Sequence, residues 1–265
     1  MAVTSARSIV NLKEKKHFER ENARINKYTL ADELPVQMSE LALQPRTMPI
    51  AKPAYTVRTL TYEDRDLVLN FLRRFFFRDE PMNLAVQLLD TTNSRCVELE
   101  EYSTCGLKDG VSVAAVDEDG EFVGIVINGL AKKEDALNGV EDDVEKCPNP
   151  KFKRILRVLK HLDKEANIWG KLPESCHTVM EVRIASTHSD WRGRGLMRVL
   201  CEESERIAKL HGASAMRMDT TSAFSAAAAE RLNYRSVYEV PYATLPDAPQ
   251  PESPHLVAKV YLKEL

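Results

Sequence analysis

Apolar and polar residues alternate over residues 55–60, and this period of two predicts a short strand. Thr61 follows as a helix N-cap, with Asp64 three positions on as its capping-box partner. Beyond them, apolar residues recur at helical spacing up to residue 76, before Pro81 ends or bends the helix. The core face of this helix is expected on Leu67, Phe71, Leu72 and Phe75.

The rest of the chain alternates between strand-like and helix-like segments. Two apolar runs around Asp119-Gly120, within residues 111–129, predict a β-hairpin. We expect helices at 151–169, 196–212 and 222–232, and strands at 178–187, 214–220, 234–240 and 255–262. This order predicts an α/β (α+β) fold in which helices cover one mixed sheet.

Residues 1–54 differ from the rest of the chain. The segment is highly charged up to about Lys27, and it then contains Pro45, Pro49 and Pro53 in an extended stretch. Glu residues near its start argue against a mitochondrial transit peptide, and it lacks the apolar run of a secretory signal. We therefore expect a flexible N-terminal extension over 1–54 and a single domain over 55–265.

Composition narrows the function classes. Hydrophobic residues make up 43% of the chain and charged residues 29%, as in ordinary globular proteins. The net charge of −3 gives no electrostatic case for a nucleic-acid or membrane-surface partner. The 5 cysteines form no CxxC pair and no zinc-type cluster, so we expect reduced thiols, a cytoplasmic location and no metal site.

The segment RIASTHSDWRGRGLMRVL, residues 183–200, carries the most chemical information. A buried-type strand leads through a glycine-rich turn directly into a helix. Glycines allow close backbone approach, and the free N–H groups of a helix start attract phosphate, with Arg192 and Arg194 adding charge. The P-loop and dinucleotide-binding patterns both fail to match this turn. The alternative is a strand-to-helix turn that binds no ligand.

The turn matches R-x-x-G-x-G/A, with Met197 at the last position, and at this point the sequence resembles the GNAT superfamily of N-acetyltransferases. Three further segments, 75–83, 221–234 and 254–265, resemble the insect-type arylalkylamine N-acetyltransferases, also called dopamine N-acetyltransferase-like. The resemblance covers about residues 55–265 in the same order. It implies the GNAT fold, a mixed, mostly antiparallel sheet flanked by helices.

The resemblance also implies where acetyl-CoA binds. The pantetheine arm would bind the main chain of the strand end Ile184, Ala185, Ser186 and Thr187. The pyrophosphate would bind the turn and helix start formed by Arg192, Gly193, Arg194, Gly195, Leu196 and Met197. Met197 stands where the family usually has Gly or Ala, so reshaped cofactor binding is expected.

The family's catalytic glutamate corresponds to Glu80, which is expected to act as the base for the amine. The alternative is that Asp79 and Glu80 are solvated loop carboxylates before a proline. Ser225, Thr221 and Ser222 are the candidates near the thioester sulfur, and Ser225 is also expected to contact the cofactor. Thr221 stands where the family has a serine; the alternative for Thr221 and Ser222 is helix capping.

The implied function is transfer of acetyl from acetyl-CoA to a small primary amine, by direct attack in a ternary complex. The family's substrates are dopamine, tyramine, serotonin, tryptamine and octopamine. Polyamines, agmatine or histamine are the nearest alternatives; a protein N-acetyltransferase and a non-catalytic CoA-binding protein are the others. Phe75, Phe76, Phe77 and Phe224 could line an aryl pocket or form core. We expect a monomer whose partners are small molecules, not nucleic acid or membrane.

Overall fold

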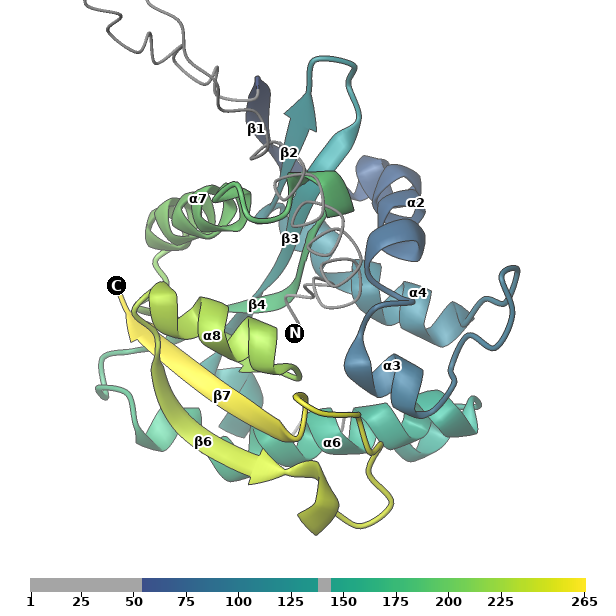
Figure 1. Cartoon of the computed structure of the whole chain (residues 1–265). Coiled ribbons are helices and arrows are strands. Elements are labelled where there is room, and N and C mark those ends of the chain that lie inside the picture. The colour runs from purple at the N-terminus through teal and green to yellow at the C-terminus, as the bar shows by residue number, and fades with distance from the viewer. Residues whose placement is uncertain (1–53, 138–143) are drawn as a thin grey trace, which may run out of the picture. The chain divides into compact units, whose positions relative to one another are not determined.

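The computed structural model describes residues 54–137 and 144–265, and in this part of the chain one 7-stranded sheet runs in the order β1-β2-β3-β4-β5-β7-β6 (Figure 1). Neighbouring strands are antiparallel except β4 and β5, which are parallel. The predicted extension lies outside the described residues except for Ala54. The strands are β1 (Tyr55–Leu60), β2 (Ser112–Asp117), β3 (Phe122–Lys132), β4 (Thr178–Thr187), β5 (Ala215–Thr220), β6 (Arg235–Pro241) and β7 (Val257–Glu264).

Helices cover both faces of the sheet. In β3, Ile125 and Ile127 pack into a core with α2, α4 and α6, whereas Val126 packs with α7 and α8 on the other face. This alternation follows from the two-residue period of a strand. The helices are α2 (Arg65–Phe75), α3 (Pro81–Ala85), α4 (Val97–Thr104), α5 (Lys133–Leu137), α6 (Pro150–Ala166), α7 (Leu196–Leu210) and α8 (Ala223–Arg231). The prediction of one mixed sheet covered by helices is confirmed.

The core face of α2 was predicted only in part, and the helices α3, α4 and α5 were not predicted. Leu67 is 57% exposed, and α2 instead buries Val68 and Leu69 beside Phe71 and Leu72. Both faces of α2 offer apolar residues at helical spacing, so the period alone does not fix which of them faces the sheet. The unpredicted helix α4 buries Glu100, an acidic residue that accepts hydrogen bonds from two arginines.

The two parallel strands pair over only part of their length. β4 and β5 pair from Val179–Ala215 to Val182–Met218, and the ends of both strands then have partners on one side only. A bulge in the β3–β4 register leaves Arg183 without a partner at the point of separation. The carboxyl ends of the strands therefore part and leave backbone groups of β4 free of a sheet partner on the β5 side.

A buried arginine lies within the paired part of β4 and β5. Arg217 is 4% exposed and stands opposite Glu181 in the strand register. Its guanidinium donates to both carboxylate oxygens of Asp219 at 2.8 Å, and it also pairs with Glu181 at 3.4 Å and with Asp163 of α6. These bonds tie β4, β5 and α6 together where the strands are still paired.

Candidate active site

The glycine-rich turn joins β4 to α7 at the end where β4 and β5 part. Gly193 and Gly195 have φ angles of 77° and 81°, a left-handed conformation that side-chain-bearing residues rarely adopt. A Cβ on Gly195 would meet no atom within 4 Å, so the backbone angle and not lack of space requires glycine. Gly195 caps α7 without a side chain, and the first N–H groups of the helix, at Leu196 and Met197, have no acceptor within the helix. The turn can therefore hold an anion.

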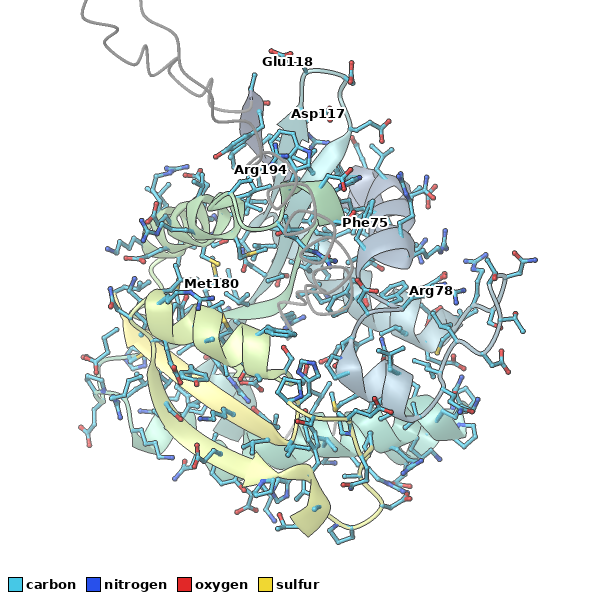
Figure 2. The ribbon with its side chains drawn as sticks, in the orientation of Figure 1. Phe75, Arg78, Asp117, Glu118, Met180 and Arg194 are labelled. Carbon is cyan, nitrogen blue, oxygen red and sulfur yellow. The ribbon has the colours of Figure 1, made fainter. Side chains whose placement is uncertain are left out.

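The predicted cofactor residues lie together at this turn, but their side chains differ in role. Arg194, on the turn before α7 (Figure 2), is exposed, and its guanidinium lies over the ring of Trp191 at 5.5 Å from the ring centroid. Met197 is half-buried and packs into the core beneath α7, so the larger side chain is accommodated inside the protein. Ser186 is buried, and its hydroxyl donates to the carbonyl of Phe75 at 3.0 Å, which ties β4 to the end of α2.

Arg192 links the glycine turn to the segment that carries Glu80. Its Nε donates to the carbonyl of Thr187 at 3.1 Å, and its Nη2 donates to Asp79 at 3.0 Å. The Arg192 side chain is 12% exposed, whereas its partner Asp79 is 38% exposed, so water reaches the carboxylate end of the pair. The sequence pattern suggested a phosphate ligand at Arg192, whereas in the structure its guanidinium is bound to protein groups that fix the turn.

The resemblance assigns this turn to acetyl-CoA, and on that assignment exchanging Arg192 for Gln should raise the KM for acetyl-CoA about 10-fold, because the turn loses its bonds to Asp79 and Thr187. Asp79→Asn should also raise this KM. The loss of kcat/KM in the double variant should be smaller than the sum of the two single losses, with a coupling free energy of about 1 kcal/mol. Steady-state kinetics of the four proteins measure this. Arg206→Gln, at an exposed ion pair further along α7, is the control; fully additive effects would show that the pair does not act as a unit.

Glu80 is the buried carboxylate of the site. It is 4% exposed and is the N-cap of α3, where Oε2 accepts the N–H of Asn83 at 2.7 Å. Pro81 occupies the first position of that helix, which suits a residue without an N–H. Burial raises the pKa of Glu80, and the N–H groups of Asn83 and Met82 and the Thr221 hydroxyl offset this only in part. Glu80 is therefore not a solvated loop carboxylate.

The structure brings Thr221 to Glu80 and pairs the two serines with each other. Thr221, 141 residues away in the chain, donates from Oγ1 to Oε1 of Glu80 at 2.9 Å. Ser222 is the N-cap of α8, and its Oγ accepts the N–H of Ser225 at 3.0 Å. The Ser225 hydroxyl bonds back to Ser222, whose N–H donates to it at 3.2 Å. Of the three candidate hydroxyls, the one that contacts Glu80 is Thr221, while Ser222 and Ser225 form a capping box.

Two residues beside this turn were not among the predicted site residues. The hydroxyl of Tyr242 donates to the carbonyl of Thr221 at 2.9 Å, and Nδ1 of His255 accepts the N–H of Ala223 at 3.2 Å. Both come from the loop between β6 and β7, and they hold the turn between β5 and α8 from either side of Ser222. Neither belongs to a local motif, so only the fold reveals them.

The four phenylalanines proposed for an aryl pocket divide into two kinds. Phe76 and Phe77 are each 2% exposed and belong to the core. Phe75, at the end of α2 (Figure 2), is half-buried, and its ring lies 4.2 Å from that of His188. Phe224 is half-buried with its ring 5.0 Å from that of His255. Phe75 and Phe224 are therefore the two that keep some accessible surface.

A cavity of about 590 Å³ adjoins Phe75 and Phe77 on the side of α2 and α4. Its wall combines these aromatic residues with four guanidinium groups, and Glu100 is the carboxylate among its lining residues. Both oxygens of Glu100 are already bonded to arginines. The wall of the cavity therefore carries both aromatic and positively charged groups. The arginines are Arg73, Arg74, Arg78 and Arg95.

The described part of the chain, 54–137 and 144–265, contains no group of three or more His, Cys, Asp or Glu residues arranged to hold a metal ion. All 5 cysteines are free thiols. Cys201 of α7 is buried, and this burial raises the pKa of its thiol to about 12. In the same residues, no helix has the length and apolar character needed to cross a membrane.

No protein-family model matches the chain. Solved structures do match it. Arylalkylamine N-acetyltransferase 2 from Aedes aegypti superimposes with a TM-score of 0.73 and 29% identity over 79% of this chain and 98% of that one. A mosquito arylalkylamine N-acetyltransferase-like 5b superimposes with a TM-score of 0.71 and 22% identity, over 80% of this chain and 100% of that one. A Drosophila melanogaster polyamine N-acetyltransferase, which forms N-acetylagmatine, superimposes with a TM-score of 0.70 and 20% identity, over 80% of this chain and 100% of that one.

Proposed function

We propose that this chain, which has the GNAT fold and whose structural relatives are acetyltransferases, transfers acetyl from acetyl-CoA to the primary amine of a small arylalkylamine. The observation that carries the proposal is the position of Glu80. A buried carboxylate, hydrogen-bonded to Thr221, lies beside the segment that Arg192 joins to the glycine turn. A base and an anion-binding turn are thus held by one set of contacts.

The base is needed because an alkyl ammonium has a pKa of about 10.4, so little of it is nucleophilic at neutral pH. Burial raises the pKa of Glu80 and brings it nearer to the operating pH, which makes the carboxylate a better proton acceptor. The same shift sets the acid limit: activity should fall as the pH drops through the raised pKa, because the protonated acid accepts no proton.

The strand end and the turn fit acetyl-CoA. The N–H groups at Leu196 and Met197 suit its pyrophosphate, and the β4 backbone beyond Val182, free of a β5 partner, suits the pantetheine amides and the thioester oxygen. The ammonium first loses one proton through Glu80 to solvent. As the neutral amine nitrogen then bonds to the acetyl carbon and the C–S bond breaks, a second proton passes from the nitrogen to Glu80. The leaving thiolate takes the proton of the Thr221 hydroxyl. Protonated Glu80 then gives its proton to Thr221, which restores both groups. Ser222 and Ser225 fix that turn.

Direct attack is favoured over an acyl-cysteine route. Cys201 is buried in α7 with its pKa raised to about 12, so almost none of it is thiolate at neutral pH. The amine should therefore attack acetyl-CoA itself, with both substrates bound at once.

We propose that the substituent of the amine enters the cavity beside Phe75, whose carbonyl accepts the Ser186 hydroxyl at the end of β4, and this cavity favours an aryl monoamine over a polyamine. Its arginines outnumber its one carboxylate, so a second ammonium group there would be repelled, whereas an aromatic ring can pack on Phe75, which keeps accessible surface. Agmatine and polyamines remain the second candidates, since a polyamine N-acetyltransferase shares the fold.

Acetyl-CoA turnover, followed as free thiol release, tests the proposal with two amine panels. We expect activity on tyramine, dopamine, octopamine, tryptamine and serotonin, with kcat/KM at least about 10-fold above that for putrescine, spermidine, agmatine and histamine. Activity confined to the second panel would overturn the substrate class and keep the chemistry. Acetyl-CoA binding without turnover of any amine or peptide would indicate a binding protein.

A further inference from the structure

Thr221 occupies a place where neither sheet nor helix fixes the chain. β5 ends at Thr220 and α8 begins at Ala223, so Thr221 lies in the turn between them. Its side chain reaches Glu80, and its backbone carbonyl accepts the hydroxyl of Tyr242 at 2.9 Å. Thr221 is 1% exposed, so water cannot replace that donor and the carbonyl depends on Tyr242.

Tyr242 is itself held firmly. It is 1% exposed, begins a short 3-10 helix after β6, and donates its N–H to the carbonyl of Leu256 at 3.1 Å. Its own carbonyl accepts from the amide of Gln250 at 3.1 Å. Burial and the nearby charge of Glu80 raise the pKa of Tyr242 well above its usual value, so the hydroxyl keeps its proton and stays a donor at neutral pH.

We propose that Tyr242 is a positioning residue for acetyl transfer: its hydroxyl fixes the backbone of Thr221 so that the Thr221 hydroxyl remains on Glu80. The residue acts through Thr221 and touches neither substrate in this role. The inference rests on the proposed function, because it gives Tyr242 a part in that reaction. It extends the site to the loop between β6 and β7, which supplies the support that the turn lacks.

Tyr242→Phe tests the inference because it removes one oxygen and keeps the ring. We expect kcat to fall about 5- to 20-fold while the KM for acetyl-CoA stays within about twofold, since the glycine turn is untouched. Tyr261→Phe is the matched control. Tyr261 is also fully buried and donates to Glu230 at 2.8 Å, but it packs in the core beneath α7 and α8, on the other face of the sheet. Its kcat should stay within about twofold of wild type.

The pH profile separates positioning from a loss of packing. The Thr221 hydroxyl lowers the pKa of Glu80, so a displaced Thr221 lets that pKa rise. The acid limb of kcat/KM should therefore move to higher pH in Tyr242→Phe and stay in place in Tyr261→Phe. In a Thr221→Val background, which has no hydroxyl to position, Tyr242→Phe should change kcat less than about twofold.

Two results would overturn the inference: equal kcat and pH profiles for the two tyrosine variants, or an undiminished effect of Tyr242→Phe in the Thr221→Val background. The test also survives failure of the proposed function. If no amine is acetylated, carboxyl NMR titration of Glu80, identified by its loss in Glu80→Gln, still reads the shift. A titration that moves to higher pH in Tyr242→Phe supports the inference, and an unmoved one overturns it.

Discussion

Glu80→Gln should lower kcat for the best amine by about two to four orders of magnitude, the range expected when a general base is removed. Gln has the same shape and can still accept the N–H of Asn83, but it cannot take a proton from the amine. The acid limb of the wild-type kcat/KM profile reflects the raised pKa of Glu80, so this limb should disappear in the variant. Thiol release from pH 5 to 9 measures both effects.

The loss should not come from unfolding. A carboxyl whose pKa is raised in the folded state stabilises the folded protein most at pH values below the pKa it has in the unfolded chain. That contribution is lost as the pH rises through the pKa it has in the folded protein. Gln is neutral throughout, so the free energy of unfolding of Glu80→Gln relative to wild type should increase with pH in urea titrations. Asp66→Asn, at a side chain that is 97% exposed, is the activity control. If Glu80→Gln lowered kcat by less than about threefold, Glu80 would not be the base.

Arg217→Met should destabilise the domain by about 3–5 kcal/mol, the cost of removing one partner from a buried ion cluster. Asp219 and Glu181, which are 16% and 23% exposed, would face each other with their shared cation gone. The affected contacts join β4 and β5 where these strands are still paired. Without them, the point at which the two strands separate would no longer be fixed. Urea unfolding gives the free energy directly.

Arg206→Met is the comparison for this second variant. Arg206 pairs with Glu203 on α7, and its side chain is 59% exposed, so its loss should change the free energy of unfolding by less than about 1 kcal/mol. Similar unfolding midpoints for the two arginine variants would show that the cluster around Arg217 contributes no more than a surface pair.

The sequence was sufficient where the chemistry is local. The glycine turn, its strand and its helix are consecutive residues, and the left-handed angles at Gly193 and Gly195 explain why two glycines are needed. The resemblance supplied Glu80 as the base, but its burial and its bond to Thr221 emerged only in the structure, because the two residues lie 141 positions apart. No periodicity connects segments at that distance.

The partners of charged side chains also could not be predicted from the sequence. The sequence proposed Arg192 as a phosphate ligand because it is basic and adjacent to the turn, but it did not predict the bond of its side chain to Asp79 from a different segment. Similarly, nothing in the pattern around α4 announced that Glu100 is buried between two arginines. Partners of long side chains are set by tertiary geometry, so composition and spacing leave them open.

The strand order has a consequence for synthesis. Among the described residues β7 is the last strand, yet it lies between β5 and β6 and pairs with both. A nascent chain therefore cannot complete this half of the sheet until residues 257–264 have emerged from the ribosome. Until then β5 and β6 present unpaired edges, which are the surfaces most prone to recruit strands from other chains. Premature termination before Val257 would consequently produce an aggregating species instead of a less active enzyme.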